Sequence, residues 1–417
     1  MELKSILSGI IMVERHIKKI LDSYSKMFPA VLVSGARQVG KTTLLKNIDI
    51  FLSSSYVTFD DPSIVYSAIN DPKLFLALHP SPIILDEIQY VPSLLRYIKM
   101  VIDQDRHNGM YYITGSQQFS LMKDVSESLA GRIGVLSLYG LSLREINKDS
   151  FSSNFLPTRA YILNRNPVVR NSNISSVWST IFRGFYPEVA VNEVLPSAFY
   201  GSYLRTYLER DVRQLSQVGD EMTFLQFLRV VATRTGNLIN YADIARCVGV
   251  DGKTIKKWIS ILETSNIIYL LYPYSGNIEK RMIKTPKLYF CDTGLASYLL
   301  NFSSPESLLS SSMAGAFFET FCVMEIIKSF ANNGVIPPIY FYRDSNGTEI
   351  DLLIDVDESI YPIEFKSTAS PNLKDLKNLK AVMSIQDKKI EKGTIICNAP
   401  EPLALNENAF ALPYTFI

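Results

Sequence analysis

The sequence predicts a multidomain α/β protein, on three observations. At 417 residues the chain is longer than the roughly 250 to 300 residues at which a single hydrophobic core stops growing. Hydrophobic residues make up 47% of it and charged residues 20%, a composition typical of globular proteins. Between about residues 27 and 145, short apolar runs alternate with longer helical stretches, as expected for buried parallel strands joined by helices.

Changes of pattern along the chain predict four segments. Residues 1–147 carry the alternating pattern and form a parallel-sheet domain. Residues 148–200 are expected to be a linker and helical connection, because residues 148–176 are rich in Asn, Ser, Pro and Arg. Residues 201–285 repeat apolar positions three and four apart, which predicts a helical domain. Residues 286–417 mix predicted strands and helices and form a second α/β domain.

A glycine-rich loop follows the first predicted strand, Ala30 to Val33, with the spacing G-x-x-x-x-G-K-T. The glycines allow backbone N–H groups to surround phosphates, and the following helix directs its positive end at the same anion. Lys41 supplies a charge to the outer phosphates and Thr42 a hydroxyl ligand to Mg²⁺. We therefore expect ATP and Mg²⁺ as ligands of a P-loop formed by Gly35, Ala36, Arg37, Gln38, Val39, Gly40, Lys41, Thr42 and Thr43.

Two adjacent acids end a second predicted strand, Ile83 to Leu85. Ligands bind beyond the carboxyl ends of parallel strands. We expect Asp86 to hold the Mg²⁺ shell and Glu87 to orient the attacking water. The alternative is that both acids only cap the next helix.

Two further residues are candidates for the same chemistry. Ser116 follows the predicted strand Tyr111 to Thr114, where a small hydroxyl can sense the γ-phosphate or, alternatively, cap a helix. Arg132 follows a predicted helix and can stabilise transition-state charge, either in its own site or in a neighbouring subunit of a homo-oligomer.

The middle of the chain has helix-turn-helix spacing from residue 238 to residue 262. Gly249 marks the turn, Asp251 or Gly252 caps the second helix, and an apolar stripe follows at Ile255, Ile259 and Leu262. Residues 267–273 then predict a wing strand, which makes a winged-helix module. The outward residues Lys253, Lys256 and Lys257 can contact DNA phosphates; alternatively, the module serves only for packing or for protein contact.

The C-terminal domain carries a D-x12-E-x-K pattern at Asp351, Glu364 and Lys366, on two predicted strands. In a restriction-endonuclease-like fold the two acids ligate a divalent metal and the lysine activates water. Glu319, on a helix predicted over residues 315–329, is a candidate additional ligand. The alternative is a nuclease-like core kept only for structure or binding.

These motifs resemble a known family. GARQVGKTTLL, LDEIQYVP, YYITGSQQFSLM and ESLAGRIGVLSL look like the N-terminal domain of prokaryotic AAA+ ATPases whose C-terminal domain is of unknown function. FRGFYPEV, YLRTYLERDV and KLYFCDTGLASYLL continue the resemblance, which implies the same nuclease-like core. The family usually has Pro at the position of Ala36 and Gly at that of Phe185, and neither departure affects a catalytic group.

Other features narrow the function classes. The apolar run from Ile6 to Val13 precedes the basic residues instead of following them, which is the wrong order for a signal peptide. Four well-separated cysteines predict free thiols in a reducing cytoplasm. The composition predicts that the chain has no membrane partner. We expect an ATPase that couples its nucleotide state to DNA binding or processing; the alternative is a nucleotide-operated switch that binds another protein through a non-catalytic docking module.

Overall fold

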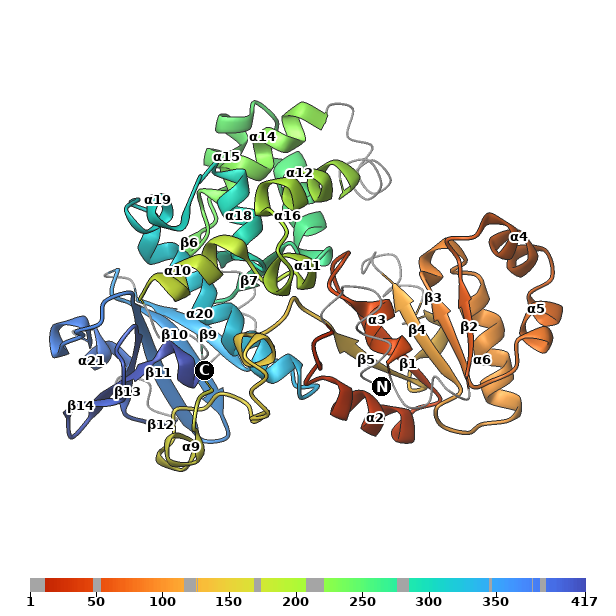
Figure 1. Ribbon diagram of the computed structural model, residues 1–417, viewed down its shortest axis with the longest axis horizontal. Coiled ribbons are helices and arrows are strands. Elements are labelled where there is room, and N and C mark those ends of the chain that lie inside the picture. Colours follow the sequence, from red (N-terminus) through yellow and green to blue (C-terminus); the bar gives the residue numbers. More distant parts are fainter. Residues whose placement is uncertain are drawn as a thin grey trace.

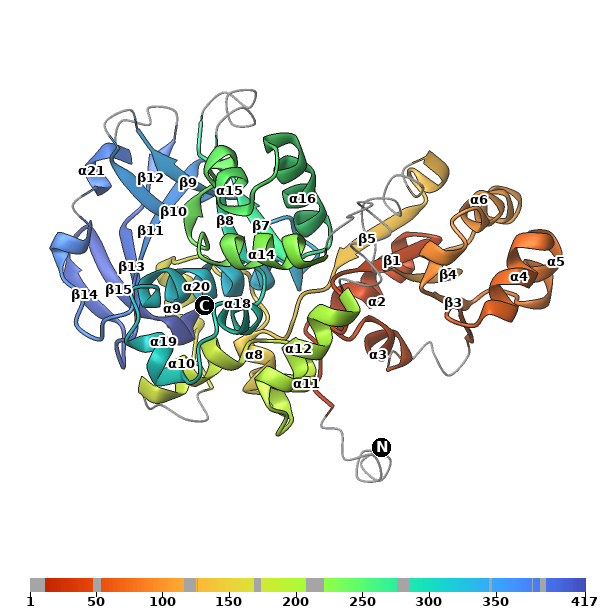
Figure 2. The same cartoon turned by 90° about the horizontal axis from the view of Figure 1, so that it is seen from above.

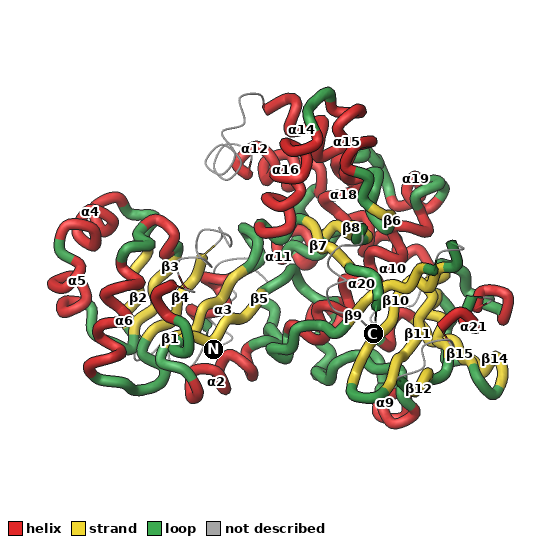
Figure 3. Tube along the Cα trace, turned by 180° about the vertical axis from the view of Figure 1, so that it is seen from behind, coloured by secondary structure: helices red, strands yellow, loops and turns green. Residues whose placement is uncertain are grey.

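The computed structural model describes residues 12–47, 54–115, 125, 127–168, 174–207, 221–275, 285–344, 347–376, 378–382 and 388–417. Figure 1 shows three bodies: a parallel-sheet body in red and orange, a helical module in green, and a mixed-sheet body in blue, here called the terminal body. Figure 3, from behind, shows strands concentrated in the first and last of these. The predicted α/β class is therefore confirmed.

The N-terminal sheet has five parallel strands in the order β2-β3-β4-β1-β5. The run Ala30 to Ser34 lies between β4 and β5 and is wholly buried, which explains why it is uniformly apolar up to its last residue. Because all five strands are parallel, their carboxyl ends meet at one edge of the sheet. The strands are β1 (Ala30–Ser34), β2 (Ser55–Thr58), β3 (Ile83–Asp86), β4 (Tyr111–Gly115) and β5 (Ile133–Ser137).

Helices cover both faces of this sheet, and their ends follow local sequence rules. Asp61 and Asp71 each cap a helix whose first residue is proline. α6 buries Leu94, Leu95, Ile98 and Ile102 at helical spacing. The helices are α2 (Lys18–Met27), α3 (Lys41–Lys46), α4 (Pro62–Asn70), α5 (Pro72–Leu78) and α6 (Leu94–Gln104), with the 3-10 turn η2 (Ile88–Tyr90). The short helix α8 (Leu143–Ile146) follows β5 and contacts α20 through the hydrogen bond from the Leu143 N–H to Glu325.

The helical module contains the predicted helix-turn-helix segment. α15 ends at Gly249, whose φ of 79° is accessible to glycine without strain. Asp251 caps α16 by accepting hydrogen bonds from the N–H groups of Lys253 and Thr254. The helices are α10 (Ile174–Arg183), α11 (Pro187–Val191), α12 (Pro196–Tyr207), α14 (Glu221–Ala232), α15 (Tyr241–Val248), α16 (Gly252–Thr264), α18 (Thr293–Leu299) and α19 (Pro305–Leu309). The short helix α9 (Arg159–Asn164) lies instead beside the terminal body (Figure 1), where Tyr161 donates to the carbonyl oxygen of Phe416.

A three-stranded antiparallel sheet, β6-β8-β7, accompanies these helices. Its strands are β6 (Asn237–Leu238), β7 (Ile268–Leu271) and β8 (Lys287–Phe290). The domain boundary predicted after residue 285 separates the central strand β8 from its two partners. α18, which follows β8, also packs on α10, α12 and α14.

The terminal body has a seven-stranded mixed sheet covered by α20 (Ala314–Ala331). The main path is β14-β15-β13-β11-β10-β9, and β12 pairs with β11. The strands are β9 (Ile339–Arg343), β10 (Glu349–Val356), β11 (Ser359–Lys366), β12 (Lys389–Ile390), β13 (Gly393–Cys397), β14 (Leu403–Asn406) and β15 (Ala409–Pro413). The shorter elements are α21 (Leu379–Val382), η4 (Leu373–Leu376) and η5 (Tyr414–Phe416).

The three bodies share a continuous apolar core. One cluster of buried side chains includes Val31 in the N-terminal sheet, Phe185 after α10, and Phe416 near the C-terminus. Figure 2 shows the helical module and α20 lying between the two large sheets. Within the described residues, no helix combines the length and apolar character needed to cross a bilayer.

Candidate active site

The P-loop follows β1 and encloses the Lys41 ammonium. Lys41 is 5% exposed, and its Nζ donates to the carbonyl oxygens of Gly35 at 3.1 Å and Ala36 at 2.9 Å. A Cβ atom on Gly35 would lie 2.1 Å from the carbonyl oxygen of Leu138, so no larger residue fits there without displacing the backbone. Gly40 has a φ of 95°, which favours glycine. The fold therefore favours glycine at both positions, at Gly35 for lack of space and at Gly40 because of its backbone conformation.

Thr42 of helix α3 and Asp86 at the end of strand β3 converge. The Thr42 hydroxyl donates to both carboxylate oxygens of Asp86, at 2.9 and 3.0 Å, and Asp86 is 3% exposed. One hydroxyl and one carboxylate are oxygen ligands that suit Mg²⁺, which usually takes its remaining ligands from water and substrate phosphates. These two side chains therefore fit the magnesium ion that the sequence predicts.

Glu87 begins a sharp turn just beyond Asp86. Its φ of 58° places it in the left-handed region, and its side chain accepts a hydrogen bond from Gln89. The backbone N–H of Glu87 donates to the Thr114 hydroxyl at 3.0 Å. The turn separates the two acids, so that Asp86 is held in the buried network while Glu87 is partly exposed at the sheet edge.

Two side chains orient Asp86, and the sequence did not predict this for either. Thr114, at the end of β4, donates its hydroxyl hydrogen to Asp86, and Tyr56 of β2 donates at 2.7 Å. Burial and the hydrogen bond to Asp86 raise the pKa of Tyr56, so it remains a donor. The available signal was their position on strands that neighbour β3. The predicted sensor Ser116 lies outside the described residues.

Arg132 lies at the wrong edge of the sheet to act in its own site. It immediately precedes β5, and Ala30 at the start of β1 pairs with Ile133. The P-loop follows the other end of β1, so roughly 16 Å of strand separates the two. Arg132 instead forms a 2.6 Å ion pair with Asp103 at the end of α6. Its predicted action within the same subunit is therefore wrong, because parallel pairing separates the start of β5 from the end of β1.

Comparisons with known protein families identify the domain that contains the P-loop and the two acids. Residues 27–147 match a family described as AAA domain. Residues 27–147 therefore form an AAA-type ATPase domain. Residues 174–306 and 314–417 match two families, each described as a domain of unknown function (DUF8612 and DUF4143).

Relatives and solved structures extend beyond the AAA domain. The chain is 27% identical to an uncharacterised protein of Mycobacterium tuberculosis over 92% of this chain and 80% of the relative, and 22% identical to one of Methanocaldococcus jannaschii over 87% and 84%. A Walker-type ATPase of Pyrococcus abyssi has a TM-score of 0.44 at 15% identity, covering 69% of this chain and 96% of that one. The Holliday junction branch migration motor RuvB of Thermotoga maritima has a TM-score of 0.30 at 16% identity, covering 62% and 89%.

A buried polar network links the P-loop of the AAA domain to α8. Arg15, 9% exposed, donates to the carbonyl oxygen of Val39 at 2.9 Å and to that of Tyr139 at 2.8 Å. Its Nε forms a 3.1 Å ion pair with Glu145, which also accepts from the backbone N–H of His16 and caps α8 together with Ser142. Burial raises the pKa of Glu145, but the charge of Arg15 and the N–H donors outweigh it and lower the pKa overall.

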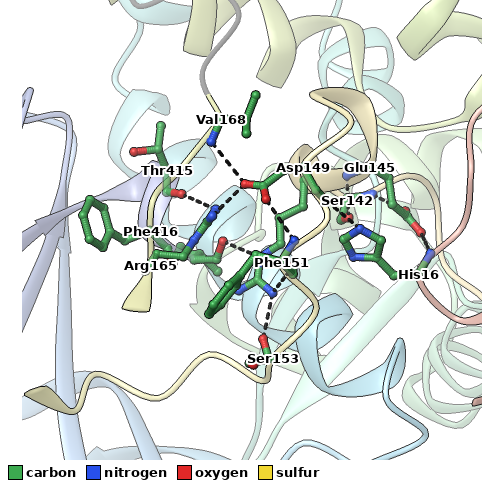
Figure 4. A network of polar contacts seen from close by, with 12 residues as sticks. His16, Ser142, Glu145, Asp149, Phe151, Ser153, Arg165, Val168, Thr415 and Phe416 are labelled. Atoms are coloured by element: carbon green, nitrogen blue, oxygen red, sulfur yellow. Dashed lines mark hydrogen bonds and ion pairs between the residues drawn. The ribbon is translucent and has the colours of Figure 1, made fainter. Parts of the chain in front are cut away.

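The same network continues into the terminal body (Figure 4). His16 contacts the Asp149 carbonyl oxygen at 2.8 Å, and Asp149 forms a 2.6 Å ion pair with Arg165. Arg165 donates to the carbonyl oxygen of Thr415 at 2.9 Å, and Arg144 donates to that of Ile417 at 2.9 Å. Polar contacts therefore run without interruption from the P-loop to the last residues of the chain.

The D-E-x-K residues come together on β10 and β11, as the sequence predicts. The register pairs Leu352 with Ile363, which places Asp351 opposite Glu364. Lys366 forms a 3.1 Å ion pair with Glu364, and Asp351 accepts a hydrogen bond from the Phe365 N–H at 3.0 Å. Burial and the charge of Asp351 raise the pKa of Glu364 to about 8.

A residue that the sequence did not predict lies among these acids. Lys287 of β8 places its Nζ 2.5 Å from Glu349, 3.3 Å from Glu319 and 3.8 Å from Asp351. The Tyr289 hydroxyl also donates to Glu319, at 2.6 Å. Burial lowers the pKa of Lys287, but the three carboxylates outweigh it and raise the pKa overall, so the ammonium stays charged.

This arrangement does not fit the predicted metal site. Two of its three expected ligands, Glu319 and Asp351, are ion-paired with Lys287. As the side chains lie in this structure, with Lys287 between the acids, no three carboxylate, histidine or cysteine side chains of the described residues are grouped so as to hold a metal ion. The prediction of a metal held by Glu319, Asp351 and Glu364 is therefore corrected: pairing of β8 with β6 and β7 brings in a lysine that local sequence does not reveal.

Proposed function

We propose that the AAA domain binds ATP with Mg²⁺ and hydrolyses it. The P-loop backbone from Ala36 to Thr43 and the Lys41 ammonium hold the phosphates, and Thr42 and Asp86 hold the ion. Glu87 orients the attacking water at the partly exposed edge of the sheet. The observation that carries this proposal is the convergence of Thr42 and Thr114 on the buried Asp86 carboxylate.

Arg132 can contribute only to the site of another subunit. Its guanidinium is partly exposed, with 28% of the side chain accessible, and is held by Asp103. If the carboxyl edge of a neighbouring subunit's sheet faces this surface, Arg132 lies beside the phosphates bound by that subunit. The proposal thus includes a homo-oligomer in which Arg132 acts on the adjacent subunit.

We further propose that the helical module is a winged helix that contacts DNA. The order α14, β6, α15, α16, β7, β8 and the strand order β6-β8-β7 support this assignment. Lys253, Lys256 and Lys257 are exposed on the first half of α16, and their positive charge suits a phosphate backbone. Residues 205–287 contain thirteen Lys or Arg against eight Asp or Glu. The basic pair Lys280 and Arg281, which follows the predicted wing strand in the sequence, lies outside the described residues.

Mg²⁺-dependent ATP hydrolysis measured with and without duplex and single-stranded DNA tests both halves of the proposal. Wild type, Lys41→Ala, Glu87→Gln and the triple change of Lys253, Lys256 and Lys257 to Gln are compared. We expect Lys41→Ala to lose ATP binding, Glu87→Gln to bind ATP but turn it over slowly, and the triple variant to lose DNA stimulation.

The outcomes separate the hypotheses. Unimpaired hydrolysis by Lys41→Ala would contradict the nucleotide site itself. Hydrolysis that is indifferent to DNA in wild type would contradict the DNA role and favour the protein-binding switch. Salt sensitivity of DNA binding provides an independent reading of the phosphate contacts.

A further inference from the structure

The acidic cluster of the terminal body, defined here as Glu319, Glu349 and Asp351, surrounds one lysine from the neighbouring three-stranded sheet. Lys287 is 3% exposed at its side chain, and its Nζ lies within 3.8 Å of an oxygen of each carboxylate. The lysine and the acids come from β8, α20 and β10, which belong to two different bodies (Figure 1). The ion cluster therefore also joins the helical module to the terminal body.

The ammonium occupies the position that a divalent cation would need. A metal ion held by Glu319 Oε1 and Asp351 Oδ1 would need the same oxygens that the Lys287 ammonium approaches. Two positive charges repel strongly at such short separation in a buried site. The Tyr289 hydroxyl occupies a further acceptor position on Glu319. Binding of a metal ion there would require Lys287 to leave.

A lack of access for metal ions from solvent does not explain why a lysine, and not a metal ion, lies among these acids. A cavity of about 340 Å³ borders the cluster, and Lys287 and Glu349 form part of its wall. Arg343 lines it from the terminal body, and Arg234, Asn237 and Asp243 line it from the helical module. A cavity of this volume has room for water and hydrated ions beside the cluster. We therefore attribute the exclusion of a metal ion to the lysine that lies between the acids.

We infer that Lys287 is the resident cation of the acidic cluster, and that the terminal body keeps a nuclease-like arrangement of acids without binding a divalent metal there. The cluster stabilises the contact between β8 and the terminal body. Asp351, Glu364 and Lys366 then belong to a core that does not cut nucleic acid.

Manganese-dependent stabilisation of the full chain tests this inference. The shift in the thermal unfolding midpoint on adding Mn²⁺ without nucleotide is measured for wild type, Asp351→Asn, Lys287→Met and the double variant, with EDTA as the metal-free control. We expect the same Mn²⁺ shift in wild type and Asp351→Asn, since neither holds Mn²⁺ at the cluster. Lys287→Met should unfold at a lower temperature than wild type in EDTA and recover several degrees with Mn²⁺, whereas the double variant should not recover.

Contrary results are well defined. A Mn²⁺ shift in wild type that Asp351→Asn abolishes would overturn the inference, as would DNA cleavage by wild type that depends on Asp351. A folded Lys287→Met protein with no extra response to Mn²⁺ would also overturn it, because the vacated position would then not be a cation site. Should Lys287→Met fail to fold with or without Mn²⁺, the comparison of wild type with Asp351→Asn decides alone. None of these readouts uses ATP turnover, so they are independent of the proposed ATPase.

Discussion

Thr114 connects the two acids that follow β3. Its hydroxyl donates to Asp86 and accepts from the backbone N–H of Glu87, so one side chain fixes both the ion-binding carboxylate and the turn that presents Glu87. A hydroxyl is suited to this position because it donates and accepts at once. Valine has nearly the same shape and can do neither.

The Thr114→Val change should therefore reduce ATP turnover more than ATP affinity. We expect kcat to fall about tenfold to a hundredfold, as is typical when a side chain that orients a metal ligand is lost. Steady-state kinetics with kcat and KM determined separately test this, and Thr114→Ser, which keeps the hydroxyl, is the matched control. Equal kinetics for the valine and serine variants would show that the hydroxyl is not needed.

Glu145 makes the stability of the AAA domain sensitive to acid. Its folded pKa lies below the ordinary 4.5, so the ionised carboxylate contributes stability that is complete above that value and is lost as the pH falls through the folded pKa. We expect wild type to lose stability on acidification below about pH 4.5, and Glu145→Gln to lose less over the same range. At pH 7 the variant should be less stable by about 3 kcal/mol, because Arg15 stays buried without its partner. Thermal unfolding from pH 3 to pH 7 measures both effects, and parallel pH profiles would contradict this role of Glu145.

At the scale of elements, the sequence predicts what is local and misses what depends on distant pairing. β1, β3 and β4 follow from buried apolar runs, and α16 follows from its cap and its stripe. Lys287 appears in the sequence only as the start of an apolar run, and its ion partners lie from 32 to 64 positions further along the chain. Arg15 likewise precedes the whole AAA domain, so no spacing rule connects it with Val39.

The exposed lysines of α16 give a prediction that belongs to that helix. If α16 lies against DNA, replacing Lys253, Lys256 and Lys257 by Gln removes up to three phosphate contacts. The slope of log affinity against log salt should then decrease by about 1 for each lost contact. Binding to duplex DNA at several salt concentrations measures the slope, with Lys73→Gln in α5 of the AAA domain as a control for the loss of a surface charge. An unchanged slope would place DNA contact elsewhere or exclude it.

At the scale of the molecule, the AAA domain and the terminal body are coupled by charge as well as by their shared core. Lys328 of α20 donates to the Leu141 carbonyl oxygen at 2.8 Å, and Glu325 accepts from the Leu143 N–H at 2.7 Å. Phe185 stacks on Phe321 at an interplanar angle of 11°. The Nζ atom of Lys328 lies 3.6 Å from the centre of the Phe185 ring. The Phe185 ring thus contacts both an aromatic ring and a cation of α20 at this junction. Buried contacts therefore connect the segment after β5 with α20 of the terminal body.

This coupling predicts that the whole chain unfolds as one unit, and that the unit divides when the buried arginines are removed. Arg144 and Arg165 bind backbone oxygens of residues 415–417, and Arg165 also pairs with Asp149. Breaking a buried ion pair costs about 3 to 5 kcal/mol, so Arg144→Met with Arg165→Met should convert one thermal transition into two, in which the AAA domain and the terminal body unfold separately.

Calorimetry detects the division, and a nucleotide added at saturation should raise only the transition temperature of the AAA domain. Arg132→Met is the control, because its partly exposed pair with Asp103 contributes at most about 1 kcal/mol and joins no two bodies. A single transition in the double variant, raised as a whole by nucleotide, would mean that the apolar core alone couples the two ends of the molecule.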